Sequence, residues 1–268
     1  MIKNVVCRVV FLSLGILLFV VASYGQTQIN GAASGNWSNT ASWSPATVPN
    51  NGGGNTYDVT LLSSPAVVIT LDINPTIDTL TLDSGSELTT NAGTTLTTTG
   101  LTNGGYINFA NGNTLTVNGA TTNTGEITLY NASTANFNGN FTNSNAFYTD
   151  GKSTATVTGT FTNSDYVDME SSGDVLNVGT LTNNSEIVIG TGATLNITGG
   201  GSGITTVAAG STLYVQGTLN VINGGTPSNA LASLTTVAGS LIWENGQTLT
   251  DTPIGGTLTI NSGAVQSD

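Results

Sequence analysis

A 20-residue interval organises the middle of this chain. A Thr-Asn pair ends at five positions spaced by that interval: Asn103, Asn123, Asn143, Asn163 and Asn183. A glycine keeps the same spacing at Gly119, Gly139, Gly159, Gly179 and Gly199. Self-similarity at a fixed period is the signature of a solenoid, in which each repeat buries its apolar face only by stacking on its neighbours. The interval therefore constrains the architecture much more than it constrains any activity.

Within each repeat the apolar residues occupy odd-numbered positions, as strands with one inward face require. Ile107 and Phe109, for example, are followed one interval later by Ile127 and Leu129. Thr, Asn and Gly, which are abundant here, are poor helix formers. The pattern predicts an all-β, single-stranded parallel β-helix with three short strands per coil, about ten coils of roughly 20 residues and an N-terminal cap. Adjacent coils would lie about 4.8 Å apart.

The asparagine column shares the inward parity and falls where a strand must turn. Stacked side-chain amides can hydrogen-bond along the axis as a ladder. Alternatively, asparagine serves only the turn, because it tolerates left-handed backbone and forms Asx-turns. One coil departs from the pattern, since Asn177 occupies a core position between Leu176 and Val178. A one-residue shift such as a bulge would restore the core there.

Residues 1–25 have the pattern of a secretory signal peptide, with Lys3 and Arg8 before an apolar run from Val9 to Ala22. The run is short for a membrane span, although an uncleaved anchor is the alternative. We therefore expect a secreted protein, extracellular or at the cell surface, without membrane insertion after cleavage. Whether the chain is complete or a fragment stays open, as do end-to-end continuation of the solenoid and a further domain.

Residues 26–57 do not repeat and form the predicted entry segment. They contain Trp37-Ser38, Trp43-Ser44 and Val48-Pro49-Asn50, and Asp58-Val59-Thr60 follows. This pattern resembles the entry of secreted bacterial β-solenoid surface proteins, such as autotransporter-associated β-repeat and adhesin-like proteins of pectin-lyase-like β-helix architecture. The alternation and the interval predict a solenoid over residues 58–268, strictest over 101–199, and the resemblance extends loosely to these repeats. The two tryptophans would cover the open end of the first coil, or else form an aromatic platform for a sugar.

Even-numbered residues should point outward, and one outer face gathers tyrosines and acids. Its candidate ligand-binding residues are Tyr148, Asp150, Tyr166, Asp168 and Glu170. Tyrosine presents an apolar ring with a polar tip, and carboxylates accept sugar hydroxyls or hold Ca²⁺, for which Asp150 and Glu170 are the candidates. The alternative is a solvated surface whose acids prevent aggregation. We call these residues and their outward neighbours on the same strands the Tyr/acid face.

A second outer face carries hydroxyls and amides, and we call it the Thr/Asn face. Its expected columns are Thr114, Thr134, Thr154, Asp174, Thr194 and Thr116, Asn136, Thr156, Leu176, Asn196. Such columns suit strand propensity and ladder packing. A more remote interpretation is ice binding, because regular threonine arrays on a flat solenoid favour it.

The chemistry available to this chain is narrow. Formal charge is −12, Lys3, Arg8 and Lys152 are its only basic residues, and histidine is absent. So acidic a surface repels nucleic acid. We expect no catalytic residues and no metal or cofactor other than the Ca²⁺ for which Asp150 and Glu170 are candidates, and we expect Lys152 to pair with Asp150 at the surface. The sequence thus predicts a non-enzymatic structural or adhesive protein whose partner is an extracellular glycan or a host or neighbour-cell surface. The alternative is a polysaccharide-binding or polysaccharide-degrading protein acting through the Tyr/acid face.

Overall fold

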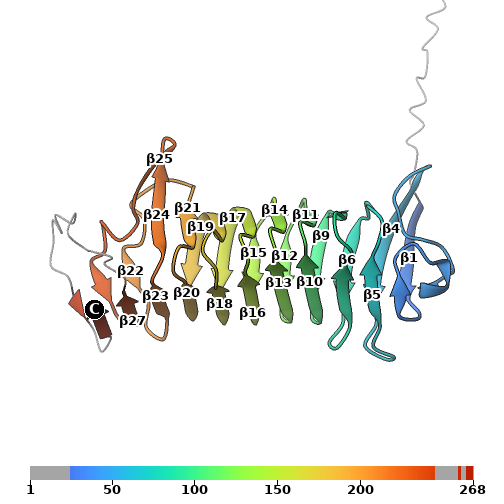
Figure 1. The fold of residues 1–268 in the computed structure, drawn as a ribbon, viewed down its shortest axis with the longest axis horizontal. Coiled ribbons are helices and arrows are strands. Elements are labelled where there is room, and N and C mark those ends of the chain that lie inside the picture. Colours follow the sequence, from blue (N-terminus) through green and yellow to red (C-terminus); the bar gives the residue numbers. More distant parts are fainter. Residues whose placement is uncertain (1–24, 245–258, 261–263, 268) are drawn as a thin grey trace, which may run out of the picture.

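The computed structural model describes residues 25–244, 259–260 and 264–267. Over these residues the chain is a rod of stacked strands, with one short 3-10 helix at Thr40–Ser42. Figure 1 shows the coils side by side along a single axis. The predicted parallel β-helix is confirmed. The predicted leader lies outside the described residues, apart from Gly25.

Wall 1 of the rod is one parallel sheet in which equivalent strands of successive coils pair in register. Tyr106 pairs with Glu126 and Ile107 with Ile127, so the side-chain columns follow the 20-residue interval. The strands are, in order, β2 (Gly35–Asn36), β5 (Val68–Leu71), β7 (Glu87–Thr90), β10 (Tyr106–Ala110), β13 (Glu126–Tyr130), β16 (Ala146–Thr149), β18 (Tyr166–Met169), β20 (Glu186–Ile189), β23 (Thr212–Val215), β27 (Ser240–Trp243) and β29 (Ala264–Ser267).

Walls 2 and 3 belong to a second sheet, because β17 (Thr154–Asn163) and β19 (Val175–Asn183) run through both. Wall 2 also contains β8 (Thr95–Thr98), β11 (Thr114–Val117), β14 (Thr134–Phe137), β21 (Thr194–Ile197) and β24 (Thr218–Asn223). Wall 3 contains β1 (Gly25–Gly31), β4 (Asn55–Leu61), β6 (Thr79–Leu82), β9 (Gly100–Asn103), β12 (Thr121–Asn123) and β15 (Phe141–Asn143). The three strands expected in each coil are thus present in the middle of the rod.

The period loosens towards the ends of the rod. Ile187 pairs with Leu213, 26 positions later, and Leu213 pairs with Leu241, 28 positions later. Extra residues there form a protruding hairpin, in which β25 (Thr226–Asn229) folds back antiparallel on β24, visible at the top of Figure 1. About eight turns of roughly 20 residues stack, where about ten were expected, and the remaining wall 1 strands at the two ends of the rod belong to longer coils.

The core is a continuous column of inward side chains from all three walls. Four phenylalanines meet in its middle: Phe137 from wall 2, Phe141 and Phe161 from wall 3, and Phe147 from wall 1, all fully buried. The Phe141 ring lies 4.5, 5.1 and 5.4 Å from the rings of Phe137, Phe161 and Phe147. These separations fall within the range of favourable aromatic pairs.

The predicted asparagine ladder is present at the corner between wall 3 and wall 1. Each Nδ2 donates to the Oδ1 of the asparagine in the next coil, at 2.8, 2.7, 2.9 and 2.9 Å from Asn103 to Asn183. Each Nδ2 also donates to a backbone carbonyl at the start of the next wall 1 strand, such as that of Ala146 for Asn123. The side chains therefore link adjacent coils as well as completing the turn.

The expected register shift at Asn177 is confirmed. Leu176 pairs with Ala155 and Val178 with Val157, after which the register moves by one before Thr160 pairs with Thr180. Asn177 consequently faces outward and bonds to Thr156 and Asn196. The expected Thr/Asn columns were wrong at two positions, because Leu176 is buried in the core and Asp174 is buried in the preceding turn. Val175 and Asn177 take their places.

The N-terminal end is closed by the two tryptophans of the entry segment. Their ring centroids lie 4.9 Å apart, and both rings are buried. Each indole N–H is satisfied by a backbone carbonyl, that of Pro49 for Trp37 and that of Trp37 for Trp43. Burial excludes the sugar platform as a role for these rings. The parallel stack itself already begins with β1, which pairs with β4, rather than at residue 58.

Candidate functional site

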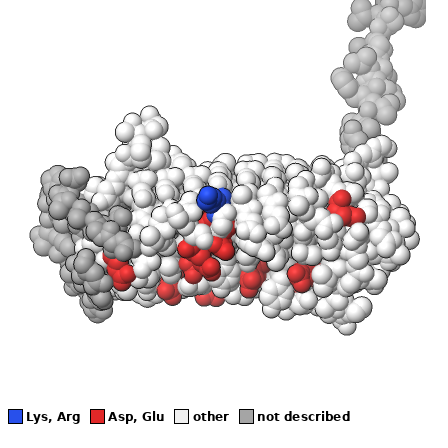
Figure 2. All heavy atoms as spheres, in the orientation of Figure 1, with Lys and Arg blue, Asp and Glu red and all other residues white. Residues whose placement is uncertain are grey.

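The Tyr/acid face lies on wall 1, where β16 and β18 are paired neighbours. Tyr148 pairs directly with Asp168, and Ala146 pairs with Tyr166. Both tyrosines and Asp168 are half-buried, which is typical of side chains standing on a solvent-exposed sheet. Figure 2 shows carboxylates gathered along one long side of the rod.

The two tyrosines and Asp168 form a connected cluster. The rings of Tyr148 and Tyr166 meet edge to face, with centroids 5.8 Å apart. The hydroxyl of Tyr166 donates to Oδ2 of Asp168 at 2.9 Å. Tyr166 and Asp168 alternate along one strand, so this bond holds the ring along the sheet surface. The cluster therefore has a preset shape that depends on two adjacent coils.

Asp150 and Glu170 occupy equivalent positions just past the ends of β16 and β18. The Asp150 amide donates to the Leu129 carbonyl at 2.9 Å, and the Glu170 amide donates to the Thr149 carbonyl at 3.0 Å. The Asp150 carboxylate accepts the hydroxyl hydrogen of Ser171. The structure thus brings all five predicted residues together on two adjacent coils. Whether they bind a ligand stays a prediction.

Burial and the neighbouring carboxylates raise the pKa values of three groups in this cluster. Partial burial, followed by the charges of Asp168, Asp150 and Asp174, raises the pKa of Glu170 above its ordinary value. Desolvation, followed by nearby acids, raises the pKa of Tyr148. Desolvation and then the hydrogen bond to Asp168 raise the pKa of Tyr166. The face therefore offers neutral phenols beside carboxylates, a surface suited to hydroxyl-bearing or cationic ligands.

Lys152 does not form the expected ion pair with Asp150. It follows Gly151 in a turn where both residues have positive φ, at 69° and 67°. A Cβ added to Gly173 would come within 3.0 Å of the Lys152 side chain, so that chain lies along the next coil. In Figure 2 the blue Lys and Arg atoms adjoin the red carboxylates from above.

The same face continues towards the N-terminal end of the rod. Tyr106 and Tyr130 are the most exposed tyrosines here, at 52% and 37% of their surface. A shallow groove of about 300 Å³ runs between Glu87, Tyr106 and Glu126. The Tyr/acid face therefore extends over several coils, which suits a long or repetitive partner better than a small ligand.

The Thr/Asn face lies on wall 2, where Thr114, Thr134 and Thr154 pair in register across three coils. Along β17, Thr154, Thr156, Thr158, Thr160 and Thr162 alternate outward. Across coils, paired threonines form an unbroken column on wall 3: Thr81, Thr102, Thr122, Thr142, Thr162 and Thr182. These hydroxyls repeat at about 6.7 Å along a strand and about 4.8 Å between coils.

One site was not expected from the sequence. Between the coils that carry β19 and β22 (Thr206–Val207), wall 3 is interrupted and a cavity of about 220 Å³ opens. The available signal was the loss of the Thr-Asn interval after Asn183, together with the run Gly199-Gly200-Gly201-Ser202-Gly203. These features show that the coil changes but not that it leaves a cavity.

Among the residues that the structure describes, no three His, Cys, Asp or Glu side chains are grouped as a metal ion would require. No helix in that part of the chain has the length and apolar character of a membrane span. In comparisons with known proteins, no family model, curated protein or solved structure matches this chain.

Proposed function

We propose that this chain is a secreted, non-enzymatic β-solenoid that serves as a structural or adhesive element outside the cell or at its surface. The observation that carries the proposal is the in-register stacking of coils along wall 1, from β10 to β20. Stacked repeats hold side chains at fixed spacing along a stiff axis, which allows many weak contacts to act together. The leader-like residues 1–25 and the motifs of the entry segment support the extracellular location.

Adhesion is tested by coating beads with the purified protein and counting their attachment to cells and to polysaccharide-coated surfaces. The critical variant is Tyr148→Ala/Asp168→Ala/Glu170→Ala. Its matched control is Thr142→Ala/Thr162→Ala/Thr182→Ala, which alters three outward side chains of wall 3. Attachment lost only in the first variant supports adhesion through the Tyr/acid face. N-terminal sequencing of the exported protein tests whether the chain is secreted and its signal peptide removed, and an unprocessed intracellular product would contradict secretion.

A second candidate is recognition of a polysaccharide by the Tyr/acid face. The favouring observation is the edge-to-face pair of Tyr148 and Tyr166 with Asp168 beside it. Tyrosine rings contact the apolar faces of sugars, and the carboxylate accepts their hydroxyls. Glycan-array binding that disappears in the triple variant would support this role, and unchanged binding would count against it. Product release from pectin or alginate would show that the protein is an enzyme.

Ice binding by the Thr/Asn face is the remote candidate. The in-register column of Thr114, Thr134 and Thr154 on wall 2 favours it, because a hydroxyl array repeated along the strands and between coils can order water. Thermal hysteresis of the purified chain tests it directly, with Thr134→Lys as the variant that interrupts the array. Absence of hysteresis in the parent protein removes this candidate.

A further inference from the structure

Wall 3 has an open strand edge at its last regular coil. In β19, residues Val175–Val178 pair with Thr194–Ile197 of the next coil, but Thr180–Asn183 pair only with the preceding strand, β17. At the equivalent position the amides of Leu101 and Thr121 donate to carbonyls of the following coil, at 3.2 and 2.9 Å. No such acceptor faces Leu181 among the described residues. The edge therefore offers backbone groups that a further strand would satisfy.

The gap beside this edge is held open by specific contacts. The following coil leaves β21 through Gly200, Gly201 and Gly203, all with positive φ, and does not return over β19. Asn223 accepts from the Gly201 amide at 2.9 Å and donates to its carbonyl at 3.1 Å. The Ile204 amide donates to the Ala230 carbonyl at 2.7 Å. The β24–β25 hairpin region thus anchors the displaced segment, and the cavity is a built feature of this coil.

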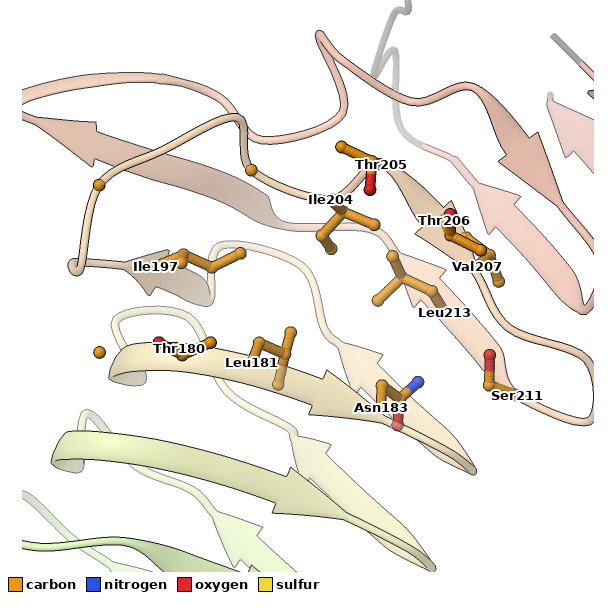
Figure 3. Close-up of a pocket in the computed structure, with 13 residues that line it drawn as sticks. Thr180, Leu181, Asn183, Ile197, Ile204, Thr205, Thr206, Val207, Ser211 and Leu213 are labelled. Atoms are coloured by element: carbon orange, nitrogen blue, oxygen red, sulfur yellow. The ribbon is translucent and has the colours of Figure 1, made fainter.

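The cavity is lined by both apolar and polar residues, none of which is charged. Figure 3 shows Leu181 and Asn183 on β19 facing the displaced segment across the cavity. The apolar lining comprises Leu181, Ile197, Ile204, Val207 and Leu213. A cavity of about 150 Å³ lined by such side chains admits a benzene ring, so about 220 Å³ accommodates one bulky apolar side chain.

The asparagine ladder also ends in this cavity. Each earlier asparagine of the ladder donates to an Oδ1 in the next coil, whereas among the described residues Asn183 donates only to the carbonyls of Ser185 and Thr212. Asn183 lines the cavity. An amide oxygen placed over it would extend the ladder by one step. The open edge, the apolar cavity and the end of the ladder are therefore three complementary features in one place.

We propose that this gap binds an extended, uncharged peptide segment of another polypeptide, with a bulky apolar residue two positions before an asparagine. The segment pairs in parallel with Thr180–Asn183, its apolar side chain enters the cavity above Leu181, and its asparagine continues the ladder above Asn183. Strand addition of this kind obtains affinity from backbone bonds and specificity from a side-chain pocket. The motif matches the strands already stacked below, such as Phe161-Thr162-Asn163.

The test uses a fluorescein-labelled hexapeptide, Gly-Thr-Phe-Thr-Asn-Ser, with fluorescence anisotropy of the full chain as titrant. We expect saturable binding, weakened about tenfold or more by Phe→Ala in the peptide, because an apolar anchor loses its burial. Replacing the peptide asparagine by aspartate should also weaken binding, and a scrambled peptide should not bind. Hydrogen exchange at the Leu181 amide should slow when the parent peptide is bound, since that amide gains an acceptor.

Two protein variants distinguish specific binding of the peptide in the gap from non-specific binding to exposed strands. Thr206→Trp places a large ring at the mouth of the cavity and should abolish binding. Thr182→Trp is the matched control, because Thr182 lies between Leu181 and Asn183 but is exposed on the outer surface. Circular dichroism verifies that both variants fold. Absence of saturable binding overturns the proposal, as does binding that survives Thr206→Trp or Phe→Ala, or that leaves Leu181 exchange unchanged.

Discussion

The asparagine ladder should be a major source of coil-to-coil stability, and Asn143→Ala tests this at its centre. The substitution removes the bond that Oδ1 accepts from Asn123 at 2.7 Å and the bond that Nδ2 donates to Asn163 at 2.9 Å. It also removes bonds from Nδ2 to the carbonyls of Asn145 and Tyr166, at 2.7 and 3.1 Å. Asn143 is fully buried, so water cannot readily replace these partners.

The magnitude follows from the four lost bonds. A net contribution of about 1 kcal/mol each, with extra cost for buried groups left without a partner, predicts destabilisation of about 3–5 kcal/mol. Some partners keep other contacts, since Asn123 still reaches the Ala146 carbonyl at 2.9 Å, and this limits the loss. Asn143→Asp should be worse at neutral pH, because a buried carboxylate would face the acceptors that Nδ2 now satisfies.

The measurement is urea unfolding followed by far-UV circular dichroism, with native-state hydrogen exchange in β12, β15 and β18 as the local readout. The control is Asn138→Ala, an exposed asparagine whose Nδ2 donates to Asn118 at 3.0 Å. It should cost less than about 0.5 kcal/mol. If Asn143→Ala and Asn138→Ala destabilise equally, the ladder argument is wrong and turn conformation alone explains the column.

Three further outcomes are expected. Phe141→Ala should destabilise the rod by about 3–5 kcal/mol, measured by the same unfolding assay, because it empties the centre of the aromatic cluster. Gly139→Ala should disrupt the stacking of adjacent coils, because the added Cβ would lie 2.5 Å from the backbone oxygen of Gly119. Native-state hydrogen exchange should show this as lost amide protection. Thr142→Ala is the control, since the exposed Gly112 has a φ of +75° and would itself be strained by a side chain. Because the pKa of Glu170 is raised in the fold, its ionisation opposes folding and this penalty disappears as pH falls through the folded-state pKa. Thermal midpoints should therefore rise on mild acidification, Glu170→Gln should raise the midpoint at neutral pH, and an unchanged acid response in that variant would contradict the assignment.

The periodic part of this protein could be predicted because a repeat turns sequence spacing into spatial contact. Residues 20 positions apart in the chain lie in adjacent coils, so the asparagine ladder, the inward phenylalanines and the pairing of Tyr148 with Asp168 follow from parity and interval. The shift at Asn177 could be anticipated for the same reason, since a polar residue at a core position conflicts with burial. The outward columns at the shift itself could not be predicted exactly, since Asp174, expected on the surface, is buried in a turn.

Only the tertiary structure decided what happens where the interval is lost. After Asn183 no fixed spacing identifies the partner of a strand, and the path of residues 199–205 depends on contacts from Asn223 and Ala230, later in the chain. Those contacts hold the coil away from β19 and leave an open edge beside an apolar cavity. The geometry of the two tyrosines likewise depends on ring packing between coils. Sequence alone therefore determined the coil and its columns, because their contacts repeat, whereas the cavity arises from non-repeating contacts that only the folded chain specifies.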